Sequence, residues 1–272
     1  MLNAQLNGCN RAYLVATKCL IMLSRCYLLI LVCWLALPIG LSAQITFGTI
    51  DYTERMSFDF GDWMPADRKK ELEAQMASGA FDMTGRVSFN DTEFSYQQLP
   101  PEEVPDGRRG GWMMRRAENP EIFYINLADS TRTDRRQIMD RSFILNEAWA
   151  APNWNIAKRK VGMSDLPLPN QLATAITAEG DTLTAYFTES IPLSIGPKGY
   201  GGLPGAIIYL KVQNEGRSVE YRMKGMQPNA PDVIVTRPDD AKEISREDFD
   251  KEQQRAKEAR ERRMREWRRS RG

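Results

Sequence analysis

The sequence predicts a mainly β protein: an antiparallel curved sheet, a sandwich or a partly open barrel, with one short helix and a C-terminal charged helix. Three observations lead to this class. Short apolar or alternating segments follow one another closely between residues 81 and 223, as expected for strands. Turn-forming pairs such as Asn90-Asp91 separate them. Helical character is confined to residues 65–76 and to the charged segment 245–272.

The first strand of the folded part is expected to carry a bulge. Ile45 and Phe47 share one parity, whereas Ile50 and Tyr52 share the other, and the change of phase lies beside Gly48. An extra residue in one strand of an antiparallel pair produces such a change.

Residues 65–76 form the expected short helix. Asp62 is a candidate for capping its first turn, and Gly79 follows its end. Leu72 and Met76 lie one turn apart, so we expect the helix to lie on a sheet with its charged face in water.

The remaining strands are expected in a close series. Residues 122–127 are apolar at both parities, which is typical of a central strand. The other predicted strands are a hairpin of 81–89 with 94–96, then 134–145, 154–156, 182–188, and 206–213 paired with 218–223.

The first 43 residues have the composition of a secretory signal peptide. They contain no acidic residue, and an apolar run from 27 to 36 is followed by Pro38, Gly40 and Ser42-Ala43. Cleavage is expected between Ala43 and Gln44, and a translation start at Met22 would give a leader of ordinary length. The predicted protein is therefore exported, to the periplasm, the outer membrane or the medium. An uncleaved anchor is the alternative, because the apolar run is nearly long enough to cross a bilayer.

Composition excludes several kinds of chemistry. The chain has no histidine, and all four cysteines lie within the leader. Disulfides, Cys/His metal sites, cysteine nucleophiles and His-dependent triads are therefore absent from the mature protein. We expect no metal and no cofactor, and aspartate and glutamate remain the main acid–base groups.

The stretch 196–210, GPKGYGGLPGAIIYL, is the strongest local pattern in the chain. Its glycines and prolines predict a tightly specified multi-turn loop that leads into a buried strand. Successive glycine amides could bind an anion, whereas the alternative is a rigid connection whose glycines serve backbone geometry. The candidate binding residues of this loop are Gly196, Pro197, Gly201, Gly202, Leu203, Pro204 and Gly205.

This loop resembles the motif of the GLPGLI family, exported proteins of the Bacteroidota with no established activity. The resemblance covers roughly residues 94–224. Its elements are Gly201 to Ile207, preceded by Ala185-Tyr186-Phe187-Thr188, Ile191-Pro192, Gly196-Pro197 and, further upstream, Trp154-Asn155-Ile156. Ala206 and Tyr186 depart from the family pattern, and the cysteine that many members carry before the motif is missing.

The resemblance implies a compartment and a set of partners more than a mechanism. Family members look like companions of outer-membrane uptake or peptidase systems. The family also has a distant similarity to the N-terminal domain of some bacterial peptide N-glycosidases, which need not be a catalytic domain. An envelope protein or an outer-membrane transporter is therefore an expected partner.

Carboxylates and tryptophans are further candidates for a site. Glu179, Asp181 and Glu189 flank the strand before the motif loop and could supply a catalytic pair, although charged residues near turns are usually solvated. The tryptophans could form a sugar- or peptide-binding platform or complete the core; they are Trp63, Trp112, Trp149 and Trp154. We assign Trp154 to the core and Trp112 to the surface.

The C-terminal segment differs from the rest in charge. Residues 245–272 carry eleven basic and seven acidic side chains, whereas residues 44–244 carry 23 and 29. Ser245 and Asp248 resemble a capping box at the start of a helix. The chain thus divides into a leader (1–43), a β domain (44–235) and a linker with a basic helical tail (236–272).

The basic tail has three open interpretations. It is a solvated helix, it docks on the acidic β domain, or it contacts an anionic membrane surface. Nucleic acid is not an expected partner of an exported protein.

The function expected from these observations is that of a non-catalytic binding or accessory factor in the cell envelope. The alternative is a carboxylate-dependent hydrolase acting on glycans or peptides, and its catalytic residues are not identifiable from sequence. A close carboxylate pair in a deep pocket would favour the hydrolase, whereas a concave face with aromatic side chains would favour the binding factor.

Overall fold

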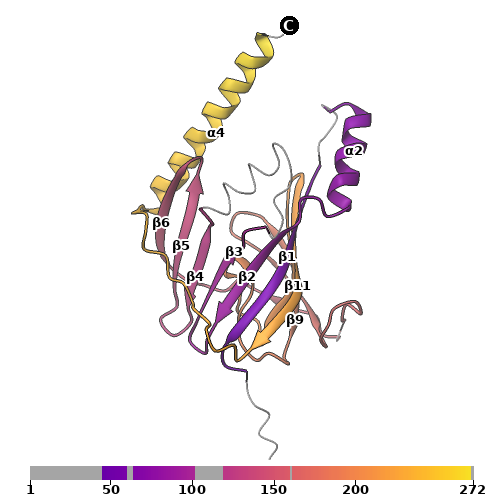
Figure 1. Ribbon diagram of the computed structural model, residues 1–272, viewed down its shortest axis with the longest axis vertical. Helices are drawn as coiled ribbons and strands as arrows, with labels where there is room; N and C mark the ends of the chain where they lie inside the picture. Colours follow the sequence, from indigo (N-terminus) through magenta and orange to yellow (C-terminus); the bar gives the residue numbers. More distant parts are fainter. Residues whose placement is uncertain (1–44, 60–63, 102–118, 160, 271–272) are drawn as a thin grey trace, which may run out of the picture. The chain divides into compact units, whose positions relative to one another are not determined.

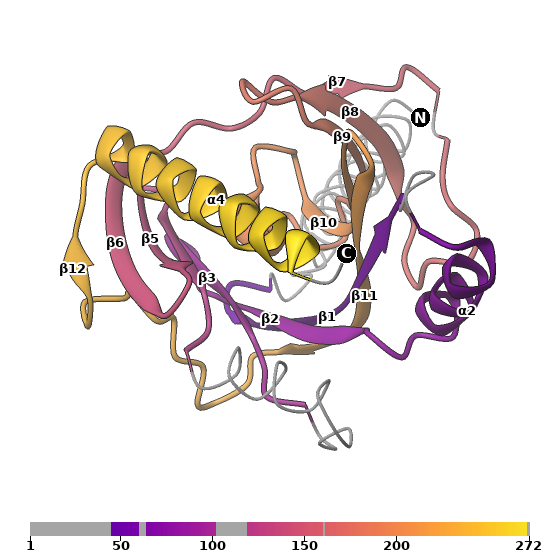
Figure 2. The same cartoon turned by 90° about the horizontal axis from the view of Figure 1, so that it is seen from above.

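The protein folds as one twelve-stranded sheet. The computed structural model describes residues 45–59, 64–101, 119–159 and 161–270. The strand order is β12-β6-β5-β4-β3-β2-β1-β11-β10-β9-β8-β7, and every neighbouring pair is antiparallel except β12 with β6. The sheet curves round one concave face without closing into a barrel (Figures 1 and 2). The predicted mainly-β class is confirmed, in its open curved form.

Most strands lie where the alternating segments of the sequence predict them, but the expected strand 134–145 is wrong: a turn at 139–140 divides it into β5 and β6, which pair as a hairpin. The predicted hairpin, the central strand and the strand at 182–188 are all present, the last with the predicted limits. The strands are β1 (Gly48–Phe58), β2 (Met83–Phe89), β3 (Glu93–Gln98), β4 (Ile122–Asn126), β5 (Thr131–Ile138), β6 (Arg141–Ala148), β7 (Asn155–Ile156), β8 (Gln171–Ile176), β9 (Thr182–Thr188), β10 (Ala206–Asn214), β11 (Arg217–Pro228) and β12 (Lys242–Glu243).

The bulge expected in the first strand lies in its partner β11. Asp51 pairs with Gly225 and Tyr52 with Met223, so Lys224 is the extra residue, and β1 itself pairs with β2 without a shift. β1 therefore alternates without interruption and directs Ile50, Tyr52, Glu54 and Met56 to the buried side of the sheet. This alternation places a carboxylate, Glu54, among apolar core side chains.

The concave side of the sheet contains the main core. Alternate residues of the strands pack there, and the Tyr52 hydroxyl donates a hydrogen bond of 2.6 Å to the Ile207 carbonyl. The bond joins the first strand to the strand that follows the glycine-rich loop. The largest fully buried members of this core are Tyr52, Tyr96, Phe89, Phe94, Phe187, Ile50, Ile125, Leu183, Ile191 and Ile195.

The helix α2 (Ala66–Ala77) occupies the predicted segment. None of its residues is buried, and Leu72 and Met76 are half-buried. Pro65 stands at its N-cap without a side-chain hydrogen bond, while the expected cap, Asp62, lies outside the described residues. The charged face is exposed as predicted, but the helix contributes little to the core.

The C-terminal segment contacts the sheet before the last helix begins. The Thr236 amide donates a hydrogen bond of 3.0 Å to Ser95 Oγ, and Asp240 forms an ion pair of 3.2 Å with Arg135. The chain then adds β12 beside β6. The predicted linker is therefore held to the sheet at several points.

The predicted C-terminal helix is α4 (Arg246–Arg269). Half of its expected capping box is present: the Asp248 amide donates a hydrogen bond to Ser245 Oγ at 3.1 Å, whereas the Asp248 carboxylate accepts from the Ser245 hydroxyl at 2.9 Å and not from the Ser245 amide. Phe249 is 2% exposed and packs with Phe143 and Leu145. The first turns of α4 thus dock on β5 and β6, from which the helix extends (Figure 1). In the part of the chain that the structure describes, neither α2 nor α4 combines the length and the apolar character that a membrane-spanning helix needs.

Candidate functional site

A cavity of about 1050 Å³ lies on the concave side of the sheet. Inward-facing residues of β1, β4, β5 and β11 contribute to it, and Gln253 places the first turns of α4 at its margin. The turns between β8 and β9 and between β10 and β11 supply Glu179, Asp181 and Glu215. Secondary-structure elements from both halves of the chain thus form one polar cavity.

Part of the glycine-rich loop enters this cavity. Residues Pro197–Gly199 form a short 3-10 turn, η2, in which Lys198 and Gly199 both have positive φ, 57° and 79°. A Cβ atom at Gly199 would lie 2.6 Å from Cδ1 of Ile125, so only glycine allows the loop to pack this closely on β4. This approach brings Lys198, Gly199 and Tyr200 into the cavity lining.

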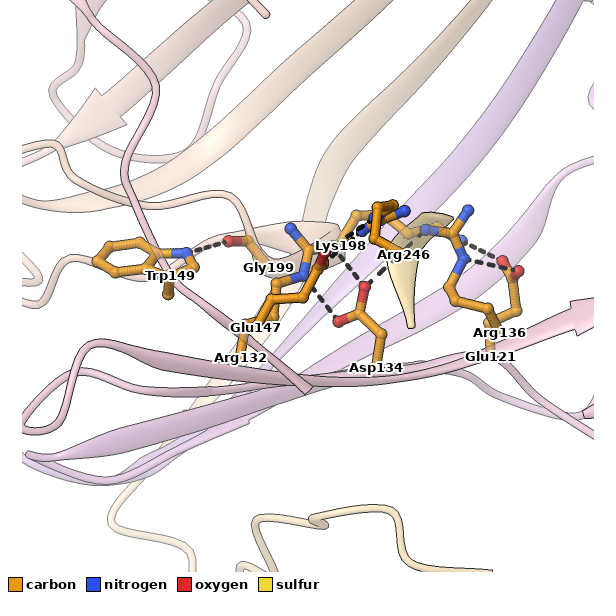
Figure 3. Close-up of polar contacts among 9 residues, drawn as sticks. All are labelled: Glu121, Arg132, Asp134, Arg136, Glu147, Trp149, Lys198, Gly199 and Arg246. Carbon is orange, nitrogen blue, oxygen red and sulfur yellow. Dashed lines mark hydrogen bonds and ion pairs between the residues drawn. The ribbon is translucent and has the colours of Figure 1, made fainter. Parts of the chain in front are cut away.

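A chain of alternating charges forms one wall (Figure 3). Lys198 Nζ lies 3.3 Å from Glu121 Oε2, and Arg136 Nε lies 3.2 Å from Glu121 Oε1. Asp134 Oδ2 lies 3.9 Å from Arg136 and 2.7 Å from Arg132. Each carboxylate is thus in contact with two cations, as expected for charges withdrawn from water.

Asp134 stabilises this wall rather than contacting a ligand. Its side chain is 0% exposed, and burial raises its pKa, although Arg132 and Arg136 oppose the increase. The two arginine side chains remain about one quarter exposed, at 25% and 26%. The guanidinium ions of Arg132 and Arg136 are therefore the groups that face the cavity, and Asp134 holds them in position.

Aromatic rings lie beside these cations. The Phe123 ring centre is 4.7 Å from Lys198 Nζ and 5.3 Å from the guanidinium carbon of Arg136, distances at which cation–π attraction operates. Burial raises the pKa of Tyr200 to about 12 and holds that of Tyr221 well above its usual value. Both phenols therefore stay protonated and offer a hydrogen-bond donor as well as an apolar face.

Glu54 is a carboxylate of the cavity lining that has no cationic partner among the described residues. It lines the cavity although only 2% of its surface is exposed. The Tyr96 hydroxyl donates to its Oε2 at 2.9 Å, and Gln98 Nε2 donates to the same atom at 2.6 Å. No hydrogen bond to Oε1 is found from the residues that the structure describes.

The helix α4 is attached to the same wall. The Arg246 guanidinium donates two hydrogen bonds to the Glu147 carboxylate, one of them 2.9 Å long, and this pairing lowers the pKa of Glu147. Phe249 meets Phe143 edge-to-face with ring centres 6.2 Å apart. The Arg136 guanidinium carbon lies 5.9 Å from the centre of the Phe249 ring. The charged wall of the cavity and the helix anchor therefore share Arg136.

Part of this fold matches a known family model. Residues 127–209, which include most of the glycine-rich loop, match a family described as "Protein of unknown function (Porph_ging)". No curated protein matches the chain.

Solved structures of PNGF-II are distantly similar to this chain in their backbone arrangement. Two of them, in P21 and C2 space groups, align with a TM-score of 0.46 and identities of 11% and 10%. Each alignment covers 77% of this chain but only 34% or 33% of the other. The chain therefore spans about one third of the length of these proteins.

Five of the seven residues predicted as a loop site are buried, whereas Gly202 and Pro204 are exposed. A Cβ atom at Gly201 would lie 2.5 Å from the Ser194 carbonyl oxygen, and one at Gly205 would lie 2.0 Å from that of Thr188. The Gly202 amide donates to Ser194 Oγ. These contacts give the glycines a structural role, and ligand binding by the seven loop residues stays a prediction.

The four tryptophans and the three flanking carboxylates have separate locations. The Trp149 indole donates to the Gly199 carbonyl at 3.1 Å, and the Trp154 indole donates to that of Gly201 at 2.8 Å. Trp149 also lines the cavity, whereas Trp154 packs against the core as predicted. Trp63 and Trp112 lie outside the described residues. Glu179 and Asp181 stand at the cavity, and Glu189 is exposed elsewhere.

Sequence reasoning missed the charged residues of the cavity. Glu54 shares the parity of Ile50, Tyr52 and Met56, and this agreement was the available signal for an inward-facing carboxylate. The other missed residues are Glu121, Arg132, Asp134, Arg136 and Lys198.

Proposed function

We propose that the protein is a non-catalytic binding or accessory factor whose ligand occupies the concave cavity. The observation that carries this proposal is the cavity itself, whose polar groups are held by ion pairs and strand geometry. Binding sites are usually preformed concavities with a few oriented polar groups among apolar ones. Arg132, Arg136 and Lys198 beside Phe123 and Trp149 provide this combination.

The rival function, a carboxylate-dependent hydrolase, has less support from the same geometry. Such a mechanism needs one carboxyl that can hold a proton at the substrate and a second one at a fixed separation. Burial raises the pKa of Asp134, but this side chain has no exposed surface. Glu121 is ion-paired with two cations. Hydrolysis would therefore depend on Glu54 or on the carboxylates of the lining turns, Glu179, Asp181 and Glu215, and an activity assay belongs in the test of function.

The test is recovery of a ligand with the intact chain. The protein purified from its native envelope would be analysed by native mass spectrometry, and glycan and peptide libraries would be screened by thermal shift and for product release. We expect a bound species that is lost in Arg132→Gln or Lys198→Gln and kept in Lys211→Gln. Lys211 is paired with Glu220 at 3.1 Å and does not line the cavity in the described structure, which makes it the matched control. Turnover of a substrate by the wild-type chain, or a ligand kept in both cavity variants, would overturn the proposal.

We also propose that the chain is an exported GLPGLI family protein. The proposal is supported by the leader composition and by the motif run 196–207, all of which lies within the matched segment 127–209. Intact mass and N-terminal sequencing of protein from envelope and medium fractions test it. A chain that begins at Gln44 is expected, and one that retains residues 27–43 would overturn cleavage.

The exposed half of α4 suggests a second contact, with an anionic membrane surface. Residues 257–269 carry seven basic and three acidic side chains, and each basic residue near an anionic surface contributes on the order of 1 kcal/mol. We expect salt-sensitive binding of the full chain to vesicles rich in anionic lipid, with loss on truncation after Ala256. Equal binding to neutral vesicles would contradict this contact.

A further inference from the structure

We infer that the ligand of the cavity is an uncharged carbohydrate and that Glu54 accepts a hydrogen bond from one of its hydroxyl groups. The inference rests on the proposed function, because it names the chemical class of the ligand and the residue that recognises it.

One carboxylate oxygen of Glu54 has no protein donor among the described residues. Tyr96 and Gln98 both donate to Oε2. A carboxylate has about four acceptor positions, and Glu54 lines the cavity, so Oε1 is the atom available to a ligand donor.

The cavity lining carries both signs of charge. Its cations are Arg132, Arg136, Lys198 and Arg217, and its carboxylates are Glu54, Glu121, Glu179, Asp181 and Glu215. Neither sign is in large excess, so the lining gives an ammonium or guanidinium ligand little net attraction to offset the cost of removing its charge from water. A neutral hydroxyl satisfies Oε1 without that cost.

An anionic ligand would meet cations that are already paired within the protein. Glu121 already lies within 3.3 Å of Lys198 and 3.2 Å of Arg136, and Asp134 lies within 2.7 Å of Arg132. The cations are thus largely neutralised by the protein. Glu179, Asp181 and Glu215 also line the cavity and repel an approaching anion. The remaining class is a neutral ligand with several donors and acceptors.

The side chains and the volume of the cavity suit a sugar. Phe123, Trp149, Tyr200 and Tyr221 line the cavity together with the polar groups. Aromatic faces beside hydrogen-bonding groups suit a sugar ring, which has an apolar face and a polar edge. The volume of about 1050 Å³ is at the upper end of the ~300–1,000 Å³ typical of small-molecule pockets. An oligosaccharide fills such a space better than a single sugar.

The experiment compares ligand classes on the full chain. Neutral oligosaccharides, uronic-acid oligosaccharides and short peptides would be titrated by calorimetry. We expect the neutral oligosaccharides to bind most tightly. If acidic oligosaccharides or peptides bind instead, the ligand class is wrong, while the proposed binding function stands. If no member of the three classes binds and the native protein carries no ligand, both are overturned.

The role of Glu54 is tested with Glu54→Gln, which keeps the side-chain shape and an oxygen for Tyr96. Loss of a hydrogen bond to a charged acceptor is expected to weaken binding about 10- to 150-fold. Glu220→Gln, on the outer surface beside Lys211, is the matched control and should bind as the wild type does. Equal affinity of Glu54→Gln and wild type would overturn the assignment.

A second measurement does not depend on the folding of that variant. Monodeoxy analogues of the best oligosaccharide would be titrated against the wild-type protein. One analogue should bind more weakly than the parent oligosaccharide by a similar factor. Glu54→Gln, where it folds, should bind this analogue no more weakly than the wild-type protein does. Uniform affinity across the monodeoxy series would overturn the hydroxyl contact to Glu54.

Discussion

Replacement of Phe249 by alanine should release α4 from the sheet while leaving the sheet folded. Phe249 is 2% exposed and is the fully buried apolar side chain in this helix. The other anchors are exposed ion pairs, Arg246 with Glu147 and Arg141 with Glu252. Because exposed ion pairs contribute between about 0 and 1 kcal/mol each, the aromatic contact dominates the docking free energy.

The size of the effect follows from two terms. Full burial of a phenylalanine side chain contributes about 1.5–3 kcal/mol. An edge-to-face aromatic pair adds about 0.5–1.5 kcal/mol, and Phe249 forms such a pair with Phe143 at 6.2 Å. The loss on truncation is therefore about 2–4.5 kcal/mol, which corresponds to a decrease of about 30- to 1,600-fold in the docking equilibrium.

Amide hydrogen exchange measured by mass spectrometry would detect this change. Peptides from residues 246–256 should lose protection in Phe249→Ala, while peptides from β1 and β11 should not. Met264→Ala is the matched control, because Met264 is 47% exposed on the same helix. Unchanged protection of residues 246–256, or an equal loss throughout the sheet, would refute the reasoning.

Three further outcomes are expected. Gly205→Ala should lower the free energy of unfolding by about 1–3 kcal/mol, because the new Cβ would lie 2.0 Å from a carbonyl oxygen. Gly225→Ala is the control and should change it little, because no atom lies within 4 Å of the added Cβ. Equal urea midpoints for the two variants would contradict this prediction. Trp154→Phe should cost about 0.5–1.5 kcal/mol through loss of its 2.8 Å bond to the loop, and an unaltered urea midpoint would show that the bond contributes nothing. The protection of the α4 amides against hydrogen exchange should be complete above the ordinary glutamate pKa of about 4.3. It should fall as the pH drops through the lowered folded-state pKa of Glu147. Glu147→Gln should remove the part of this pH dependence that comes from pairing with Arg246.

The sequence predicted elements whose apolar residues follow a simple period. The strand Thr182–Thr188 and the hairpin of β2 and β3 alternate clearly; the structure keeps the limits of the first and moves those of the hairpin by one or two residues. It did not predict β8 (Gln171–Ile176), whose small and polar residues lack a continuous apolar face. It also did not predict β12, because two charged residues form a strand only through pairing with β6.

The cavity was harder to predict for a physical reason. Arg132, Asp134 and Arg136 alternate along β5, and alternating charges usually mark the face of a strand that lies in water. Here that face is turned inward, and the charges are stable because Glu121 and Lys198 complete the ion pairs from other elements. Partners that are distant in sequence decide this outcome, and no local pattern shows them.

The two edges of the sheet affect how separate molecules meet. An exposed edge strand offers unpaired amide and carbonyl groups to another chain, and long, flat edges favour aggregation. Here the outermost strands are β7 and β12, each only two residues long. Long strands such as β1 and β11 are paired on both sides. β7 pairs with residues 173–174 of β8 and β12 with residues 143–144 of β6. Each therefore interrupts the free edge of a longer strand and shortens the continuous stretch open to strand addition, which should help the protein to stay dispersed at high concentration.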